Sequence, residues 1–450
     1  MKKYFSVWMK SIGSFGKLFF IIFILTGYLS AQITTLNEAE NLARKYALQL
    51  QIAEKGVKIA KFGIRDAIGN GLPSISAYGQ ATTNHELASM IISMPGTDGI
   101  VRPMALTMGS KYSNTAGLSL SQPLFTGGAV FAGYKIAKEG VVLSKINQKM
   151  TIDNTVLTVR SFWYQYMLTN SLIEATEQAL SSAKGNLELV NKKYNAGSVS
   201  QFELLQAKVS FEQLKPQIIQ LKNQLKIIVT NLSAYLNDPD KRKIEPQGIL
   251  VMENNPFENT TLENIIKTGE KNRLELQLMV SQKKILIQQR NIVMGQTLPM
   301  LSLSADLRQQ AQAENKDDLD YLRSKSTSLN ISIPLFSGGR KIASIQKSRV
   351  AIKEAELQEK QTRTFIRTEI ESMYYKVEEA EKRITANATL VEQAGEALRL
   401  AELMYENGSS TQLDVQNARS AVLQAKSAHY SAIFEYNMAL NQLKKSMNQL

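Results

Sequence analysis

The sequence predicts an α+β membrane protein in which long α-helical hairpins are joined to a small set of amphipathic β-strands. Three observations lead to this fold class. The chain of 450 residues begins with an apolar leader, the rest of it contains an internal duplication, and each copy carries sustained heptads beside short segments of alternating polarity. With no cysteine and only 10 prolines, the chain has no disulfide framework and few helix breakers.

Residues 1–31 are typical of a secretory signal peptide. Four lysines precede an unbroken apolar run from Leu18 to Leu25, and small residues lead to Ala31, where we expect cleavage. The alternative is a membrane anchor, but the run is shorter than the roughly 20 residues that a spanning helix needs. The leader carries four lysines and no acidic residue, so its removal lowers the net charge of +13 to 13 − 4 = +9.

Two motifs recur at one fixed offset. The hexapeptide Pro-Leu-Phe-Thr-Gly-Gly at 123–128 returns as Pro-Leu-Phe-Ser-Gly-Gly at 334–339, which is 211 residues later. The tetrapeptide Tyr-Asn-Ala-Gly at 194–197 returns as Tyr-Glu-Asn-Gly at 405–408, again 211 residues later. Equal spacing indicates connecting elements of fixed length, as rigid helices are.

A third landmark recurs at a different offset. Leu72-Pro73 returns as Leu298-Pro299, which is 226 residues later. The difference of 15 residues therefore indicates an insertion in the first copy between Pro73 and Pro123.

These landmarks predict three parts after the leader. The first repeat is expected at 32–236, an inter-repeat linker at 237–260 and the second repeat at 261–450. Each repeat is predicted to run as helix, strand, loop, strand, long helix, turn and helix.

The long helices are predicted from heptads. Apolar residues recur every seven positions from Ile152 to Tyr194, and the second copy keeps the same spacing from Ile370 to Tyr405. A helix from about Gly128 to Tyr194 would be roughly 100 Å long at 1.5 Å per residue. This length exceeds what a globular core requires.

The strands are predicted from alternation. Leucines at 301, 303 and 307 alternate with polar residues, and residues 328–335 alternate in the same way. One face for lipid and one for water is typical of a membrane barrel strand, although a half-buried sheet of a soluble protein alternates similarly. The secretory leader favours the barrel. Four strands per chain cannot close one, so several copies must assemble.

The recurring hexapeptide is predicted to be an elbow between a strand and a long helix. Proline is expected to end the strand pairing, and the two glycines to allow a sharp change of direction. The elbow residues are Pro123, Gly127, Gly128, Pro334, Gly338 and Gly339.

The duplicated hairpins, the two hexapeptide elbows and the two Tyr-x-x-Gly-x-x-x-Gln tips resemble the TolC-like outer membrane efflux protein family, the outer membrane factors of tripartite efflux or type I secretion systems. The resemblance covers essentially the whole mature chain. It implies a homotrimer with a 12-stranded outer-membrane β-barrel in lipid, continued by a long periplasmic α-helical coiled-coil barrel. It also implies two partners, a periplasmic membrane-fusion adaptor and an inner-membrane transporter of the RND, ABC or MFS type.

The resemblance places a pore constriction just after the helical turns. Asp414 matches the first acidic ring position of the family, whereas the second is occupied by Asn417, so a strong double ring is not expected. Glu203 and Gln206 are the equivalents in the first repeat. A ring of carboxylates would favour cations. The alternative role for Asp414 and Glu203 is to cap the first turn of a helix.

The tips themselves are expected to be exposed and to contact the adaptor. Gly197 and Gly408 suit the left-handed end of a helix. Family channels often carry a latching arginine shortly after this glycine, where this chain has Ser410. The expected contact residues are Gly197, Ser198, Gln201, Gly408, Ser409 and Gln412.

The sequence contains no motif for catalysis, nucleotide binding or zinc, and we expect no enzyme activity, cofactor, metal or nucleic-acid partner. His429 lies on the heptad seam, where packing between helices is expected, and His85 lies near the end of the first strand or in its loop. The loop at about 82–112 carries four methionines, Met90, Met94, Met104 and Met108, for which loop packing or strand extension is favoured over a path for soft metal ions.

The predicted function is therefore a passive outer-membrane exit duct that conducts cargo from an inner-membrane pump to the outside. In such systems the pump selects the cargo. The alternative is a non-channel periplasmic coiled-coil scaffold with a small sheet at one end.

Overall fold

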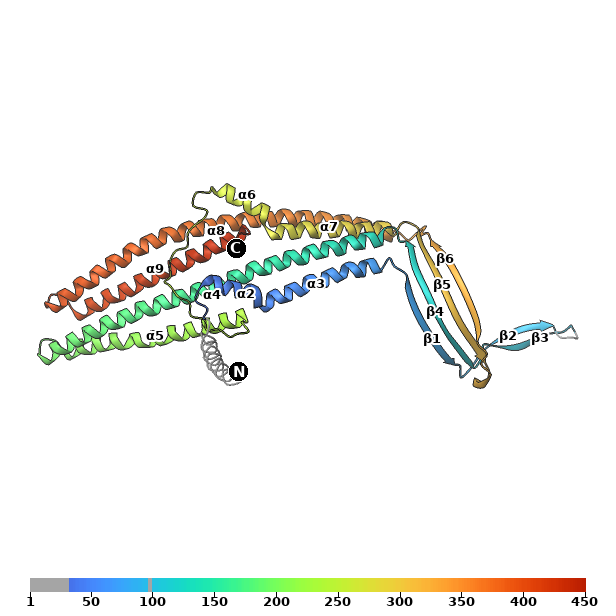
Figure 1. The fold of residues 1–450 in the computed structure, drawn as a ribbon, viewed down its shortest axis with the longest axis horizontal. Coiled ribbons are helices and arrows are strands. Elements are labelled where there is room, and N and C mark those ends of the chain that lie inside the picture. Colours follow the sequence, from blue (N-terminus) through green and yellow to red (C-terminus); the bar gives the residue numbers. More distant parts are fainter. Residues whose placement is uncertain (1–31, 96–98) are drawn as a thin grey trace, which may run out of the picture. The chain divides into compact units, whose positions relative to one another are not determined.

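A computed structural model describes residues 32–95 and 99–450 (Figure 1). The signal peptide predicted at 1–31 lies outside the described residues. The chain divides into two compact units. The first combines the part up to Glu54 with Asn147–Leu274 and Thr362–Leu450, and the second combines Lys55–Ile146 with Glu275–Gln361.

Each half of the chain begins with a short helix and a longer one. Helices α2 (Leu36–Tyr46) and α6 (Leu262–Asn272) have 11 residues each, and α3 (Leu48–Gly69) and α7 (Leu274–Gly295) have 22. The sequence predicted a single helix at this place in each half. That expectation is wrong because Ala47 and Arg273 take extended backbone angles, ψ 127° and 123°, which interrupt the helical path.

The main sheet has four antiparallel strands in the order β1-β4-β5-β6. They are β1 (Ser74–Thr83), β4 (Tyr112–Phe125), β5 (Met300–Ala313) and β6 (Leu322–Ser332), and a short 3₁₀ turn (Lys316–Asp318) lies between the last two. The registers align the apolar residues of neighbouring strands. Leu118 pairs with both Ala77 and Leu307, so the alternation predicted from sequence forms one continuous apolar face.

The insertion of the first half forms its own hairpin. Strands β2 (Ala88–Pro95) and β3 (Val101–Met108) pair with each other as a separate two-stranded sheet. Met90 and Met104 lie in these strands and are 52% and 58% exposed. Of the two possibilities favoured from sequence, loop packing is therefore wrong, and the segment is an additional pair of strands.

Four long helices make up the rest of the fold. Helices α4 (Ala129–Asn195) and α8 (Arg340–Glu406) have 67 residues each, and they are followed by α5 (Gln201–Leu236) and α9 (Gln412–Ser446). The heptad prediction of a helix from about residue 128 to 194 is confirmed. Helix α5 continues through Pro216 without a break in its assignment.

A buried apolar cluster holds the first unit together around the linker. Val159 and Trp163 of α4, Leu232 of α5 and Ile433 of α9 pack with Ile244 of the linker. The amide of residue 33 donates to the carbonyl of residue 243 at 2.9 Å, and residues 33 and 244 form an isolated parallel bridge. The linker is thus packed into the core of this unit.

A polar network anchors the linker beside this cluster. The carboxylate of Glu253 accepts hydrogen bonds from Lys444 Nζ at 2.6 Å, from Asn441 Nδ2 at 3.0 Å and from the Tyr164 hydroxyl. The amide of Glu253 donates to Asn437 Oδ1 at 2.8 Å, and Asn437 is fully buried. Burial raises the pKa of the Glu253 carboxyl, but these hydrogen bonds outweigh burial, and the net pKa lies below its ordinary value.

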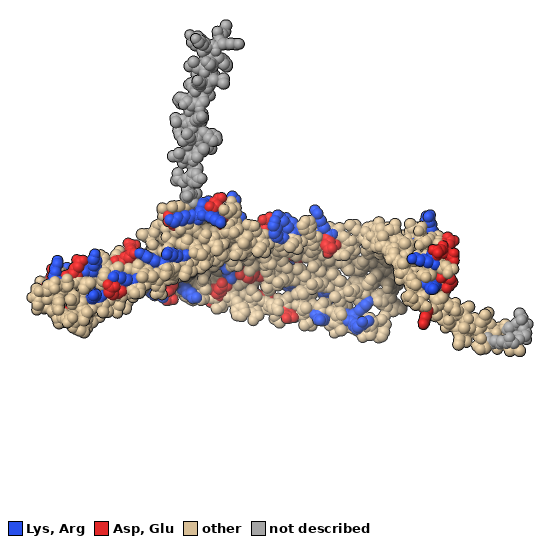
Figure 2. Space-filling view, turned by 90° about the horizontal axis from the view of Figure 1, so that it is seen from below, with Lys and Arg blue, Asp and Glu red and all other residues tan. Residues whose placement is uncertain are grey.

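Charged residues are mixed in sign over the surface in view. Figure 2 shows lysine and arginine side chains interspersed with aspartate and glutamate rather than gathered in one basic patch. The face in view therefore has no basic patch of the kind that binds nucleic acid. Among the described residues, no helix is long and apolar enough to cross a membrane.

Replacing Glu253 with glutamine is expected to destabilise the first unit by about 3 kcal/mol, because Lys444 would lose its partner while its side chain stays 17% exposed. Thermal unfolding of the purified protein in detergent, followed by helical circular dichroism, measures the effect. The matched control is Glu245→Gln in the same linker, whose more exposed pair with Lys243 should contribute at most about 1 kcal/mol. Equal shifts for both variants would contradict the proposed anchor.

The pH dependence has a definite sign. Because folding lowers the pKa of Glu253, its stabilising contribution is complete above the ordinary carboxyl pKa of 4.5 and is lost as the pH falls through the lowered value. The thermal midpoints of wild type and Glu253→Gln should therefore converge on acidification below that range.

Candidate functional site at the tips of the helical hairpins

The first tip is a tight turn between α4 and α5. Gly197 has φ +71°, and the amide of Ser198 donates to the carbonyl of Lys193 at 2.9 Å. This pattern closes the end of α4 as a left-handed glycine cap does. Helix α5 then begins after Ser200, whose side chain accepts from the amide of Glu203 at 3.3 Å.

The second tip repeats this geometry between α8 and α9. Gly408 has φ +77°, and the amide of Ser409 donates to the carbonyl of Met404 at 2.8 Å. Thr411 caps α9 and forms a reciprocal capping box with Asp414. The left-handed glycines predicted at 197 and 408 are therefore confirmed.

Asp414 is a capping residue in this structure. Its Oδ2 accepts from the Thr411 hydroxyl at 2.7 Å, from the Thr411 amide at 2.9 Å and from the Ser410 hydroxyl at 3.2 Å. These hydrogen bonds, the Thr411 hydroxyl first, lower the pKa of Asp414, so the carboxylate is charged at neutral pH. The side chains of Asp414 and Asn417 are both exposed on α9. The capping alternative is thus confirmed for Asp414, and it leaves a charged, accessible group.

One tyrosine joins the two tips. Tyr405 of α8 is only 3% exposed, and its hydroxyl donates to Glu203 Oε2 at 3.2 Å. Lys193 of α4 donates to the carbonyl of Tyr405 at 2.6 Å and lies 4.6 Å from the centre of its ring. Burial, and then the nearby Glu203 carboxylate, raise the pKa of Tyr405 to about 12, so the hydroxyl stays protonated and remains a donor at neutral pH.

A small apolar cluster surrounds this contact. Val190 of α4, Ala207 of α5, Tyr405 of α8 and Val415 of α9 are all buried together. Each hairpin contributes one residue from its outgoing helix and one from its returning helix. The tips are therefore packed against each other within one chain.

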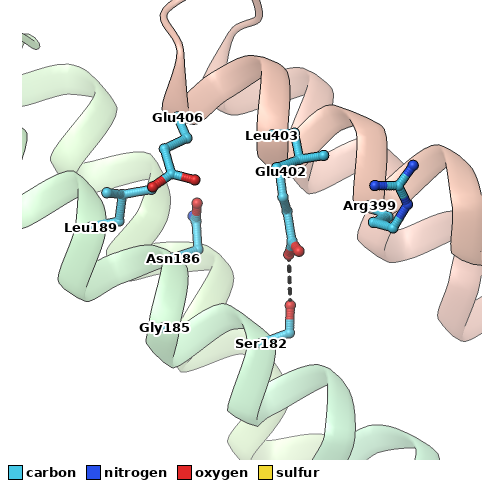
Figure 3. Close-up of a pocket in the computed structure, with 8 residues that line it drawn as sticks. All are labelled: Ser182, Gly185, Asn186, Leu189, Arg399, Glu402, Leu403 and Glu406. Carbon is cyan, nitrogen blue, oxygen red and sulfur yellow. Dashed lines mark hydrogen bonds between the residues drawn. The ribbon is translucent and has the colours of Figure 1, made fainter.

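A groove of about 590 Å³ lies next to this cluster, between α4 and α8 (Figure 3). Its walls are formed by residues one helical turn apart on each helix: Ser182, Gly185, Asn186 and Leu189 from α4, and Arg399, Glu402, Leu403 and Glu406 from α8. The groove is open to solvent rather than a closed catalytic pocket.

The groove is bordered by a charged network that crosses three helices. The Ser182 hydroxyl of α4 donates to Glu402 Oε1 of α8 at 2.9 Å, drawn as a dashed line in Figure 3. Arg419 of α9 is 5% exposed and contacts both groups, with Nε donating to Ser182 at 3.1 Å and a terminal nitrogen donating to Glu402 at 3.3 Å. Asn186 is 7% exposed, and its Nδ2 has no hydrogen-bond partner among the described residues.

Most of the predicted tip residues lie where the sequence placed them. Ser198, Gln201 and Ser409 are exposed, whereas Glu203 and Gln206 are partly buried in the first turns of α5. Gln412 is the exception. Its side chain is 1% exposed, so the expectation that it is exposed at the tip is wrong. Gln412 lies three residues before the buried Val415 and shares its helix face, which is turned away from solvent.

The elbows lie in the second unit and follow the predicted geometry at their glycines. Gly127 and Gly338 have φ +62° and +60°, and each is followed by a second left-handed glycine, Gly128 or Gly339. A Cβ atom on Gly127 would lie 2.1 Å from the carbonyl oxygen of Gly295 at the end of α7. Glycine is therefore required at 127 for both its angle and its space.

The predicted effect of proline differs between the two elbows. Strand β6 ends at Ser332, before Pro334, as expected. Pro123 instead pairs with Ser302 inside β4, and the pairing continues to Phe125 after a register shift. The expectation is wrong for Pro123. The pairing of β1 with β4 ends at Ser121, so at Pro123 strand β4 is paired with β5 alone. A proline, which has no N–H, is tolerated at such an edge position.

The remaining candidates form no reactive centre. His85 lies between β1 and β2, and His429 lies partly buried in α9 with its ring 6.0 Å from that of Tyr430. Within the described residues, no group of three or more histidine or acidic residues could hold a metal ion.

The sequence did not indicate roles for Lys193, Glu402 and Arg419. Lys193 and Arg419 contact residues more than 200 positions away in the chain, and Arg419 also contacts Glu402, 17 positions away on the same hairpin. Their only signal in the sequence is a charged residue near a predicted helix end. Such residues are ordinarily part of a solvated face.

A family model described as outer membrane efflux protein matches residues 40–238 and 270–449. The alkaline protease secretion protein AprF of Pseudomonas aeruginosa is 21% identical over 333 residues, which are 73% of this chain and 68% of that protein.

Two solved structures share the fold. The outer membrane protein VceC of Vibrio cholerae has a TM-score of 0.72 at 19% identity, over 92% of this chain and 96% of that one. The CmeC outer membrane channel of Campylobacter jejuni has a TM-score of 0.74 at 18% identity, over 92% of this chain and 85% of that one. The α+β fold predicted from sequence, rich in helix and with a four-stranded sheet, is confirmed.

Tyr405→Phe is expected to loosen the tips by about 1 kcal/mol, because the ring keeps its packing while the hydrogen bond to Glu203 is lost. Amide hydrogen exchange in the segments 196–204 and 405–412 should become faster. The matched control is Tyr375→Phe on the same helix, since Tyr375 is 57% exposed. Unchanged exchange in the tip segments of Tyr405→Phe would show that the hydroxyl does not hold them.

Proposed function

The chain belongs to the outer membrane efflux protein family, and we propose that it is the outer-membrane exit duct of a tripartite efflux system or a type I secretion system. The observation that carries this function is the family match over both halves of the chain, from the first helix to the last. The family resemblance, the function and the outer-membrane localisation that the sequence predicts all agree with this family match. The duct acts by conducting cargo, and we propose no catalytic step.

The four-stranded sheet would supply one third of a β-barrel in the outer membrane. Residues of its apolar face are strongly exposed in the single chain, among them Ile75 at 72%, Leu329 at 58% and Ile331 at 63%. The opposite face is polar, and the hydroxyls of Ser76 and Ser119 lie 2.7 Å apart on it. These faces suit lipid outside and water inside.

The open edges support assembly from several copies. Strands β1 and β6 are at the two ends of the sheet and each pairs on one side only among the described strands. In hydrocarbon an open edge would leave backbone groups without hydrogen bonds. Three copies, the number that the family resemblance implies, would close a barrel of 12 strands.

The matched element lengths support an internal duplication. The 11-, 22- and 67-residue helices occur once in each half and in the same order. We assign the first repeat to 32–236, the linker to 237–260 and the second repeat to 261–450.

A stripe on α5 supports helix packing between copies. Phe202, Leu205, Val209, Ile219 and Ile227 are between 51% and 67% exposed, and they recur at spacings that place them along one side of the helix. A coiled-coil barrel of several copies would bury such a stripe.

The tips would form the constriction of the duct. The residues proposed to line it are Asp414, Asn417, Glu203 and Gln206. Asp414 supports this role because it is exposed and its lowered pKa keeps it charged. Its capping hydrogen bonds would also fix the position of the charge at the mouth of the pore.

The tips of the helical hairpins would also bind the periplasmic adaptor. The exposed turns with Gly197, Ser198 and Gln201, and with Gly408 and Ser409, offer polar groups at the tips. The groove between α4 and α8 adds the unsatisfied amide of Asn186. Gln412 is withdrawn from this contact because it is buried.

The inner-membrane partner would be a transporter of the RND, ABC or MFS type. The relative AprF is named as a secretion protein for alkaline protease, and CmeC is described as an outer membrane channel. In either kind of system the transporter would determine the cargo.

Purified protein added to planar lipid bilayers is expected to produce discrete conductance steps. A non-channel scaffold, the alternative function, would produce none even when the Tyr405→Phe change loosens its tips. Bilayers that stay silent with both proteins would contradict the duct.

Asp414→Asn is expected to reduce cation selectivity, because one negative charge per copy is removed while the asparagine oxygen can still accept the capping hydrogen bonds. The reversal potential under a KCl gradient should move toward zero. Glu378→Gln, which removes an exposed carboxylate on α8 that pairs with Lys382, is the control and should leave it unchanged. An unaltered reversal potential in Asp414→Asn would reject the selectivity role.

A further inference from the structure

We propose that β6 of one copy pairs with β1 of the next copy in a single defined register, and that Gly338 and Gly69 of the two copies approach each other as Gly127 and Gly295 do within one chain. The inference rests on the proposed function, since it assigns the contacts that would close the barrel. The proposed assembly already places a second copy at both open sheet edges, and what is new is the register of the two strands and the glycine contact.

The first observation is the close contact inside the chain. A Cβ atom on Gly127 would lie 2.1 Å from the carbonyl oxygen of Gly295, and a Cβ atom on Gly295 would lie 2.1 Å from that of Gly127. The elbow after β4 therefore packs backbone to backbone on the end of α7. Only glycine at both positions allows this approach.

The second observation is that the chain carries an equivalent glycine pair with no contact. The 211-residue offset relates Gly127 to Gly338, and the 226-residue offset relates Gly295 to Gly69. The backbone conformation is the same, with φ +62° at Gly127 and +60° at Gly338, and α3 and α7 both end on their glycine. Yet a Cβ atom on Gly69 or on Gly338 would meet no described atom within 4 Å.

Applied to the observed register of β4 and β5, the same two offsets predict the register between the open edges of two copies. Strand β4 corresponds to β6 and β5 corresponds to β1, so each observed pair predicts one pair between copies. Gly117 with Arg308 predicts Ser328 with Thr82, and Leu120 with Ala305 predicts Ile331 with Gly79.

The predicted register passes an independent test, the facing of the side chains. It places Leu329 beside Ala81 and Ile331 beside Gly79, all on the apolar side of their own sheets, where Gly79 pairs with Ala116. A register shifted by one residue would set the apolar face of β6 against the polar face of β1. The 211-residue offset also relates the two helix tips, which lie outside the strands.

Cysteine crosslinking tests the register directly, because the chain has no cysteine of its own. In Ser328→Cys/Thr82→Cys the two thiols lie on strands separated by β4 and β5 within one chain, so a bond between them forms between copies. Oxidation with diamide should convert the chains to covalent dimers and trimers on non-reducing gels.

The matched control shifts the register by two residues on the same face. Ser326→Cys/Thr82→Cys makes equally mild changes but separates the Cα atoms beyond the range that a disulfide spans. We expect at least about tenfold less crosslinked product than for the 328 pair. Stronger crosslinking of the control would overturn the register while leaving a barrel of copies intact.

The oligomeric state separates the two levels of the proposal. Protein that is trimeric by light scattering but crosslinks at neither pair would overturn this pairing alone. Protein that remains monomeric in every detergent and forms no channels would instead contradict the proposed function.

Gly69→Ala tests the glycine contact. Within one chain the added methyl group has space and Gly69 is not in the left-handed region, so the helical circular dichroism should not change. Between copies it should collide with the carbonyl of Gly338, and the trimer should dissociate at a lower temperature on native gels. Gly63→Ala on the same helix is the control, because Gln289 stands at its equivalent in α7. A Gly69→Ala trimer as heat-stable as the control would overturn the contact.

Discussion

The four-stranded sheet has one apolar face and, among the described strands, two edges without a partner, and the rest of the structure depends on how the face and the edges are covered. In water, four exposed strands with leucine and isoleucine on one side would invite aggregation. In a bilayer the same face is satisfied by lipid, but the edges are then more costly, because no water can pair their backbone groups. This is the physical reason for proposing that several copies assemble around the sheet. The glycine elbows lie after β4 and β6 and lead these two strands into the long helices α4 and α8.

The buried contacts of the first unit are distributed unevenly along its helices. Around the linker, Trp163, Leu232 and Ile433 form a large buried cluster, and Glu253 ties α4 and α9 to the linker through several hydrogen bonds. At the tips the two hairpins share a much smaller cluster, the hydrogen bond of Tyr405 to Glu203 and the hydrogen bond of Lys193 to the Tyr405 carbonyl. Because local opening requires the least free energy where buried contacts are fewest, the tips are the part of this unit most easily changed by a partner. This accords with the proposed docking there.

The helix cap and the proposed pore charge coincide at Asp414. A carboxylate in the first turn of a helix is stabilised by the helix dipole and by unpaired amides, whatever the protein does. Here the cap also keeps the charge exposed at the end of a hairpin. Gln412, two residues earlier, shows the opposite outcome, since the helix rotation that exposes Asp414 turns Gln412 into the core. Side chains in one tip motif thus divide between the surface and the interior according to helix phase.

The sequence by itself determined the long helices, the four strands of the main sheet and the order in which they follow one another. Heptads defined the long helices, alternation defined the strand faces, and motif offsets defined the spacing of the two halves, because each of these is a local periodic property that the backbone geometry imposes. The match of the tip and elbow motifs extended this to the family.

Only the tertiary structure decided which distant residues meet. The contacts of Tyr405 with Glu203, of Arg419 with Ser182 and of Gly127 with Gly295 join segments more than 160 residues apart. No periodicity encodes such pairs, since they depend on how helices are rotated and docked. The same reason explains the buried Gln412 and the strand pairing that continues past Pro123.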